Sequence, residues 1–180
     1  MTKKKHEQGE AFSLQLKFDV GQVTKAMNYQ FSGEKGSIFQ ESGLCAGCFH
    51  FGDGGTLEIE VIGIGDEKHE FSYVINDLTI TSRPTLPVPA NCLSPFDKKN
   101  ACVSIKKWGP FNRKNGKLTT ISTKAKSVLP IKKTNGQWEM SGFLSVSIKR
   151  RTDKGKEIKE NRLFYFDPEG TTGSGGDIVG

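Results

Sequence analysis

The sequence has no apolar run that approaches the roughly 20 residues of a membrane-spanning helix, so we expect no membrane span. Residues 1–10 are charged and no apolar stretch follows them, so a signal peptide is not expected either. There are only four Cys in 180 residues and no Asn-x-Ser/Thr site, which gives no support to a disulfide-rich or glycosylated secreted protein. Together these absences predict a cytoplasmic protein.

Motifs of catalysis are also missing. The chain has three His, and none of them lies in a known nucleophile motif. Neither a Gly-x-Ser-x-Gly elbow nor a Gly-x4-Gly-Lys-Ser/Thr phosphate loop occurs. We therefore predict that the protein is not an enzyme. A two-carboxylate hydrolase stays open as an alternative, because its two acidic residues can be distant in sequence.

The cysteines permit one metal hypothesis. Cys45 and Cys48 have the two-residue spacing of a zinc knuckle, which would need two further ligands. Cys92 and Cys102 are available, but the nine residues between them do not form a second knuckle. We therefore favour four thiols without metal and predict no cofactor, and we keep a zinc site at these four cysteines as the alternative.

Alternation of apolar and polar residues dominates the chain and predicts β-strands. The longest alternating segment is Gln137–Ile148, where Gly142 suggests a bulge or a close backbone approach. Arg162–Phe166 is expected to be the last strand, with apolar residues on both of its faces. The other strand predictions are Ala11–Phe18, Thr56–Ile64, Glu70–Ile75 with the residues up to Ile80, and Ala101–Lys106.

Turn residues separate these strands. Asn115-Gly116 and Asn135-Gly136 predict hairpins, and Asp153–Gly155 predicts a turn before the final strand. We also expect a polar hairpin tip at Asp66–His69. Only Asp19–Tyr29 has helical spacing, with Asp19 as a candidate cap and Gln22 three residues later.

These elements predict an all-β, single-domain, antiparallel two-layer sandwich of roughly nine or ten strands with one short helix near the amino end. Residues 11–169 form the sandwich between a basic arm, residues 1–10, and a Gly-rich tail, residues 170–180. Residues 83–95 contain four Pro and are interpreted as a crossover from one sheet to the other, with a linker between two small domains as the alternative.

The net charge of +6 conceals a division along the chain. Residues 1–97 carry 8 Lys/Arg and 13 Asp/Glu, whereas residues 98–180 carry 18 and 7. The basic half needs acidic groups nearby, which the acidic half can supply within the same molecule or in a neighbouring copy. Nucleic acid or another polyanion is the other candidate partner.

The densest basic stretch is 106–117, where two aromatic residues lie among cations. Lysines and arginines neutralise phosphates, and aromatic rings can stack on bases. The predicted polyanion site consists of Lys106, Lys107, Trp108, Phe111, Arg113, Lys114 and Lys117, with Lys124, Lys126, Lys132 and Lys133 as a possible extension. The alternative is that Trp108 packs in the core while the lysines are simply solvated.

From these observations we expect a non-catalytic structural or binding module. The favoured form is self-assembly through complementary acidic and basic surfaces, with the terminal arms tied to neighbouring copies. One alternative is polyanion binding through the loop 106–117. The other is a carbohydrate-binding β-sandwich, although Trp138 lies on the apolar side of its strand and is expected in the core.

Overall fold

The computed structural model describes residues 11–33, 49–51, 54–66, 71–84, 92–115, 120–132, 136–152, 154–167 and 169–172. These residues form eleven strands and no helix, and therefore no helix long and apolar enough to cross a membrane. The strands are β1 Ala11–Asp19, β2 Asn28–Gly33, β3 Phe49–Phe51, β4 Thr56–Asp66, β5 Phe71–Pro84, β6 Cys102–Ile105, β7 Asn112–Asn115, β8 Thr120–Pro130, β9 Gly136–Arg151, β10 Glu157–Phe166 and β11 Glu169–Thr172.

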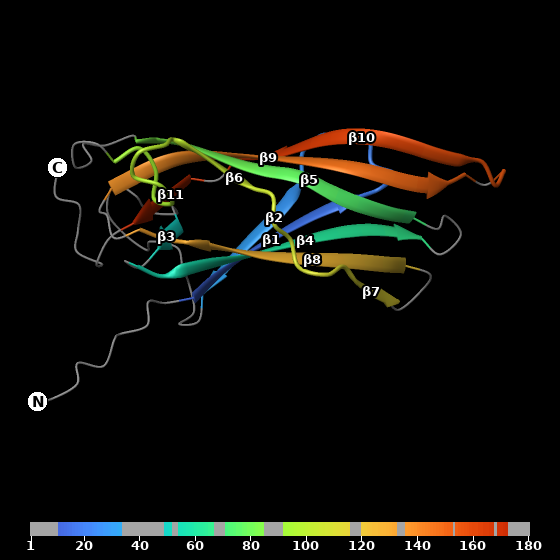
Figure 1. Cartoon of the computed structure of the whole chain (residues 1–180), viewed down its shortest axis with the longest axis horizontal. Coiled ribbons are helices and arrows are strands. Elements are labelled where there is room, and N and C mark those ends of the chain that lie inside the picture. Colours follow the sequence, from blue (N-terminus) through green and yellow to red (C-terminus); the bar gives the residue numbers. More distant parts are fainter. Residues whose placement is uncertain are drawn as a thin grey trace, which may run out of the picture.

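The strands form two sheets packed face to face, which confirms the predicted sandwich-like all-β class (Figure 1). Sheet A has five strands in the order β2-β1-β4-β8-β7. Sheet B has six, in the order β3-β11-β9-β5-β6, with β10 also paired to β9. In sheet A, β1 and β4 run parallel; the other pair of parallel strands is β3 and β11. The arrangement is thus not wholly antiparallel.

The core fills the space between the sheets. Alternation along β1, β4, β5 and β9 sends every second side chain inward, as the sequence predicted. Trp138 is 1% exposed, which confirms its expected place in the core. Other fully buried side chains include Phe18, Leu14, Leu16, Leu57, Ile59, Val61, Leu78, Leu144, Ile148 and Phe164.

Aromatic rings lie directly over glycines in the strands. A Cβ on Gly142 would lie 1.9 Å from the Phe166 ring, and a Cβ on Gly63 would lie 2.5 Å from Tyr73. The close approach predicted at Gly142 is therefore confirmed, because Phe166 is its register partner on β10. The irregularity in register lies elsewhere, in β5 between Ile75 and Asp77.

Tyr73 joins the two sheets through its hydroxyl group. From sheet B its side chain crosses the core, and the oxygen lies 2.7 Å from the Thr123 carbonyl and 3.1 Å from the Val61 carbonyl of sheet A. The same oxygen accepts the Gly63 N–H at 3.3 Å. Burial holds the pKa of Tyr73 well above its ordinary value of 10.0, so the phenol stays a neutral donor.

The helix predicted over Asp19–Tyr29 is wrong. The Asp19 carboxylate accepts the Gly21 N–H at 2.6 Å, and the Gln22 side chain donates to the Thr24 and Ala26 carbonyls. These local bonds satisfy backbone groups in an irregular path and so compete with a helix. Val23, one of the residues that suggested helical spacing, is 94% exposed.

Residues 20–27 instead form a strap along the outer edge of β10. The Tyr165 N–H donates to the Lys25 carbonyl, and the Met27 N–H donates to the Tyr165 carbonyl, both at 2.9 Å. Arg162 also donates to the carbonyls of Val20 and Gln22. The strap therefore fixes the backbone of β10 from the side opposite β9.

The crossover between sheets does not lie over residues 83–95. The strands on either side of the Pro-rich segment, β5 and β6, are antiparallel neighbours in sheet B. At the end of this segment, Cys92, Ser94 and Phe96 are buried, whereas Leu93 is exposed. The segment 106–111 is a crossover instead, because it leads from β6 in sheet B to β7 in sheet A (Figure 1).

Two of the predicted hairpins are also wrong. Asn135-Gly136 lies between β8 and β9, and Asp66–His69 lies between β4 and β5, yet in both cases the two strands belong to different sheets. Alternation cannot distinguish a return into the same sheet from a step to the opposite one. A turn between β9 and β10 is confirmed, since the two strands pair across it and Gly155 adopts a φ of 73°, although Asp153 lies outside the described residues. The prediction that Arg162–Phe166 belongs to the last strand is wrong, because β11 follows β10. For Asn115-Gly116, β7 and β8 pair as expected, although residues 116–119 lie outside the described ranges.

Candidate functional site

The predicted polyanion segment is held against β8. The Gly109 N–H donates to the Lys126 carbonyl at 2.8 Å, and the Ser127 hydroxyl donates to the Lys107 carbonyl at 2.9 Å. Lys106 and Lys107 are exposed, and within the described ranges neither has an acidic partner. Arg113 and Lys114 lie in β7, and Lys117 lies outside the described residues.

The two aromatic residues of this segment are engaged with the protein. Trp108 is partly buried against the core and donates its indole N–H to the Ile105 carbonyl at 3.2 Å. Phe111, 40% exposed, meets Tyr73 edge to face with ring centroids 5.1 Å apart. Both rings therefore pack against residues of the core. Base stacking by them stays a prediction.

The cysteines of the zinc hypothesis are described only in part. Cys92 is buried with its thiol 3.6 Å from the Ser94 carbonyl, whereas Cys102 is exposed on β6. Cys45 and Cys48 lie outside the described residues. In the part of the chain that the structure describes, no three metal-ligating side chains gather.

The outer face of sheet B carries a different kind of surface. Its exposed apolar side chains are Val74 of β5, Phe143 of β9, and Leu163 and Tyr165 of β10, with exposures of 58%, 39%, 52% and 48%. Phe143 and Tyr165 are register partners, and Leu163 precedes Tyr165 on the same side of β10. Three of the four therefore adjoin one another.

Side chains with hydroxyl, amide and carboxylate groups lie on the same face as these apolar side chains. Asn76 donates to Ser147 at 3.0 Å, and Ser147 donates to the Asn161 side-chain oxygen at 2.7 Å. Asp77 accepts hydrogen bonds from Thr79 and Ser104. We call this surface the β5–β9–β10 face; it consists of Val74, Asn76, Asp77, Phe143, Ser145, Ser147, Asn161, Leu163 and Tyr165.

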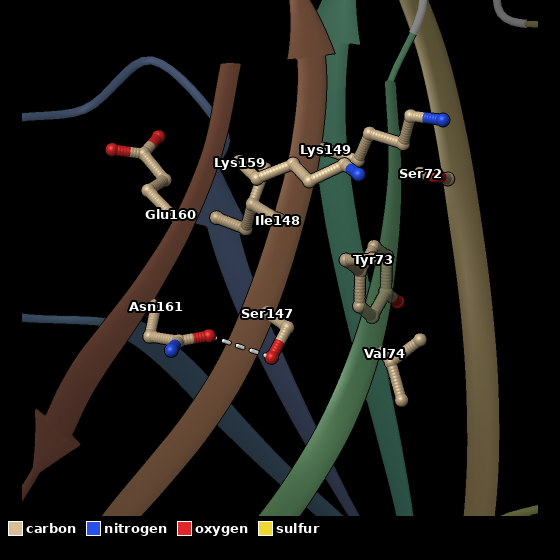
Figure 2. A pocket seen from close by; sticks show the side chains of 9 residues that line it. All are labelled: Ser72, Tyr73, Val74, Ser147, Ile148, Lys149, Lys159, Glu160 and Asn161. Atoms are coloured by element: carbon tan, nitrogen blue, oxygen red, sulfur yellow. Dashed lines mark hydrogen bonds between the residues drawn. The ribbon is translucent and has the colours of Figure 1, made fainter. Parts of the chain in front are cut away.

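A hollow of about 380 Å³ opens at one end of this face (Figure 2). Figure 2 shows Ser147 and Asn161 bonded across neighbouring strands, with Val74 on β5 beside them. The remaining lining residues are Ser72, Tyr73, Ile148, Lys149, Lys159 and Glu160.

Each charged residue that lines the hollow is paired with an oppositely charged neighbour. Lys149 and Lys159 lie 2.8 Å and 3.5 Å from the two carboxylate oxygens of Glu157. The hydrogen bond from Lys149 is the main cause that lowers the pKa of Glu157. Glu160 pairs with Arg150 at 3.1 Å. The charged groups around the hollow therefore leave no strong excess of either sign, and its lining surface is mainly apolar.

The sequence analysis missed this face as a site. Its one signal was noted: Leu163, Phe164, Tyr165 and Phe166 place apolar side chains on both sides of one strand. The structure buries Phe164 and Phe166 and leaves Leu163 and Tyr165 exposed. An apolar run of this kind in a strand with one solvated face indicates an exposed apolar surface.

No protein-family model, curated protein or solved structure matches this chain.

Proposed function

We propose that the protein is a non-catalytic binding module and that the β5–β9–β10 face is its ligand-binding surface. The observation that carries the proposal is one face that combines the exposed side chains Phe143, Leu163 and Tyr165 with a hollow of about 380 Å³ at one end. Ligand sites combine apolar surface with a few placed polar groups, and a volume of roughly 300–1,000 Å³ is usual for small molecules.

The chemistry of the hollow supports binding over catalysis. A general base needs a free carboxylate or imidazole within reach of a substrate. At the hollow, Glu160 is paired with Arg150, and Glu157 is shared by two lysines. The other polar groups, such as Ser147 and Asn161, bond one another.

The charge division between the two halves of the chain favoured self-assembly, but ion pairs within the molecule neutralise part of it. Strand β4 comes from the acidic half and β8 from the basic half, and the two are neighbours in sheet A. Lys124 pairs with Glu60 at 3.3 Å, and Lys126 pairs with Glu58. These pairs weaken the electrostatic argument for head-to-tail contacts. The terminal arms, apart from residues 170–172 in or beside β11, lie outside the described residues.

Polyanion binding remains a second candidate, because Lys106 and Lys107 are exposed without an acidic partner among the described residues. Lys106→Glu with Lys107→Glu should then abolish retention on heparin. Retention equal to that of the parent protein would eliminate this site.

The proposed function can be tested without knowing the ligand, by screening a library of small fragments against ¹⁵N-labelled protein. Small molecules of varied chemistry gather at true binding surfaces, so amide shifts should cluster at Ser145, Ser147, Asn161 and Tyr165. The outer face of sheet A, with Ser13, Gln15 and Ser32, is the internal control because it also presents hydroxyl and amide groups. Hits that cluster on sheet A or at 106–111 would refute the proposal.

A further inference from the structure

Resting on the proposed function, we infer that the ligand of the β5–β9–β10 face is a neutral carbohydrate chain. One sugar ring packs against Tyr165 and Phe143, and hydroxyl groups of neighbouring rings in the chain bond to Asn161 and Asp77. The inference follows from the kinds of groups that lie together on the face, from its charge and from its dimensions.

The aromatic pair supplies the apolar contact. Phe143 and Tyr165 lie opposite each other on neighbouring strands and keep 39% and 48% of their surface exposed. One side of a pyranose ring presents C–H groups, which pack well against an exposed aromatic ring. The Tyr165 hydroxyl adds a polar tip that can bond to a sugar hydroxyl.

Unused hydrogen-bonding capacity supplies the polar contact. The Asn161 side-chain oxygen accepts from Ser147, while its amide nitrogen has no partner among the described residues. Asp77 is held by the hydroxyls of Thr79 and Ser104, yet its two carboxylate oxygens offer about four acceptor positions. A sugar hydroxyl both donates and accepts, so different hydroxyls along one sugar chain can bond to the Asn161 amide and to the remaining acceptor positions of Asp77.

Charge and size distinguish this ligand from other occupants. The lysines beside the hollow share Glu157, so a polyanion finds less unpaired positive charge here than at Lys106 and Lys107. A stable protein partner covers about 800 Å² of each surface. On this face three exposed apolar residues adjoin one another, which is far less than such an interface needs. The hollow on the same face has the volume of a small-ligand site.

The length of the face favours a chain of sugars over a single unit. From Lys159 to Tyr165 the β10 strand rises by about 20 Å, at 3.3–3.4 Å per residue. The polar pair Ser147–Asn161 and the apolar pair Phe143–Tyr165 both lie along this length, with the pair Ser145–Leu163 between them. Several linked sugar rings can therefore contact the face at once.

The strap prepares the site in advance. Tyr165 is bonded through its backbone to Lys25 and Met27 on one side and pairs with Phe143 on the other. A ring presented from a backbone fixed on both sides loses little freedom when ligand binds. Part of the usual entropic cost of binding is thereby avoided.

The test is titration of the whole protein with cellohexaose, maltohexaose, xylohexaose and mannohexaose, followed by calorimetry and amide shifts. At least one should bind, with shifts at Asn161 and Tyr165. Tyr165→Ala should weaken binding roughly tenfold and Asn161→Ala roughly fivefold, the range expected for one aromatic contact and one hydrogen bond. Val128→Ala, an exposed valine on sheet A, is the control and should bind as the parent does.

The outcomes separate this inference from the proposed function. If none of the four sugars shifts the face at millimolar concentration while fragments still cluster there, the carbohydrate inference fails and the binding face stands. If none of the sugars binds and the fragments cluster on another surface, both the carbohydrate inference and the proposed binding face fail. If Tyr165→Ala does not fold, Asn161→Ala still decides, because its side chain is exposed; unchanged affinity in that variant would overturn the assigned contact.

Discussion

The outer faces of the two sheets differ in how their polar groups are used. On sheet A, charged side chains of neighbouring strands neutralise one another: Glu60 bonds to both Lys124 and Gln15, and Glu58 pairs with Lys126. This last hydrogen bond raises the pKa of Lys126. On sheet B, the middle of the face has hydroxyls, amides and exposed rings in place of ion pairs.

The difference shows that the charge pattern alone does not lead to the face that we propose as the binding surface. The most charged strands, β4 and β8, satisfy one another through their register, so little of that charge is left for a partner. The less charged face retains exposed polar groups, such as the Asn161 amide, that have no protein partner among the described residues. Exposed apolar side chains and polar groups without a protein partner therefore indicate a ligand surface better than the number of charges does.

Gly142→Ala should have the largest effect, because it would separate β10 from sheet B. The new Cβ would lie 1.9 Å from the Phe166 ring, which must then move and take Leu163 and Tyr165 with it. We expect a loss of roughly 2–3 kcal/mol in the free energy of unfolding, measured in urea. Gly109→Ala is the control, because its Cβ would be 3.4 Å from the nearest atom. Equal losses in both variants would contradict the packing described.

Tyr73→Phe should loosen the connection between the sheets without changing either outer face. It removes the hydroxyl that bonds to the Thr123 carbonyl and the Gly63 amide in the core. The expected loss is about 1–2 kcal/mol, the range for buried groups left unpaired. Tyr29→Phe, at a residue 41% exposed, should cost less than about 0.5 kcal/mol. A stability for Tyr73→Phe equal to that of the parent would refute the role of this hydroxyl.

The same tyrosine predicts how stability depends on pH. Its pKa is raised in the folded state by burial, whereas the unfolded chain titrates near the ordinary value of 10.0. Above about pH 10 the unfolded state therefore binds fewer protons than the folded state, so stability falls as pH rises. Urea unfolding at pH 9 and pH 11 should show a smaller fall for Tyr73→Phe than for the parent. Identical pH dependence in the two proteins would contradict a buried, neutral phenol.

Glu60→Gln should give the smallest effect and should depend on salt. It removes an ion pair with Lys124 that is only partly buried, so we expect a loss of about 0.5–1 kcal/mol at low ionic strength. In 1 M NaCl the difference from the parent should shrink, because screening weakens such pairs. Sugar binding on sheet B should remain unchanged by the same salt. A salt-independent loss would mean that Glu60 acts through packing instead of charge.

Much of the fold was predictable from alternation. The strands at Ala11–Phe18, Thr56–Ile64 and Gln137–Ile148 were identified to within a few residues, because period two with one buried face is a local property. Which sheet each strand joins is not local. Asn135-Gly136 has the composition of a hairpin turn, yet it lies between strands of opposite sheets. The helix expected over Asp19–Tyr29 does not form, because the side chains of Asp19 and Gln22 bond to backbone groups that a helix would use.

The candidate site was less accessible to sequence reasoning. The sequence shows apolar residues on both sides of β10. Which of these sides faces solvent depends on how β10 pairs with β9, and the sequence does not give this pairing. The role of residues 20–27 depends on a contact with Tyr165, more than a hundred positions further along the chain. Distances of that kind in sequence leave no local pattern.

The order of strands has a consequence for synthesis of the protein on the ribosome. Sheet A takes strands as early as β1 and as late as β8, and sheet B is complete only with β11. An emerging chain therefore exposes open strand edges until β8 and β9 have left the exit tunnel. Non-local pairing of this kind folds slowly and is exposed to aggregation in the meantime. The nascent first half should depend on chaperones or on rapid completion of the chain.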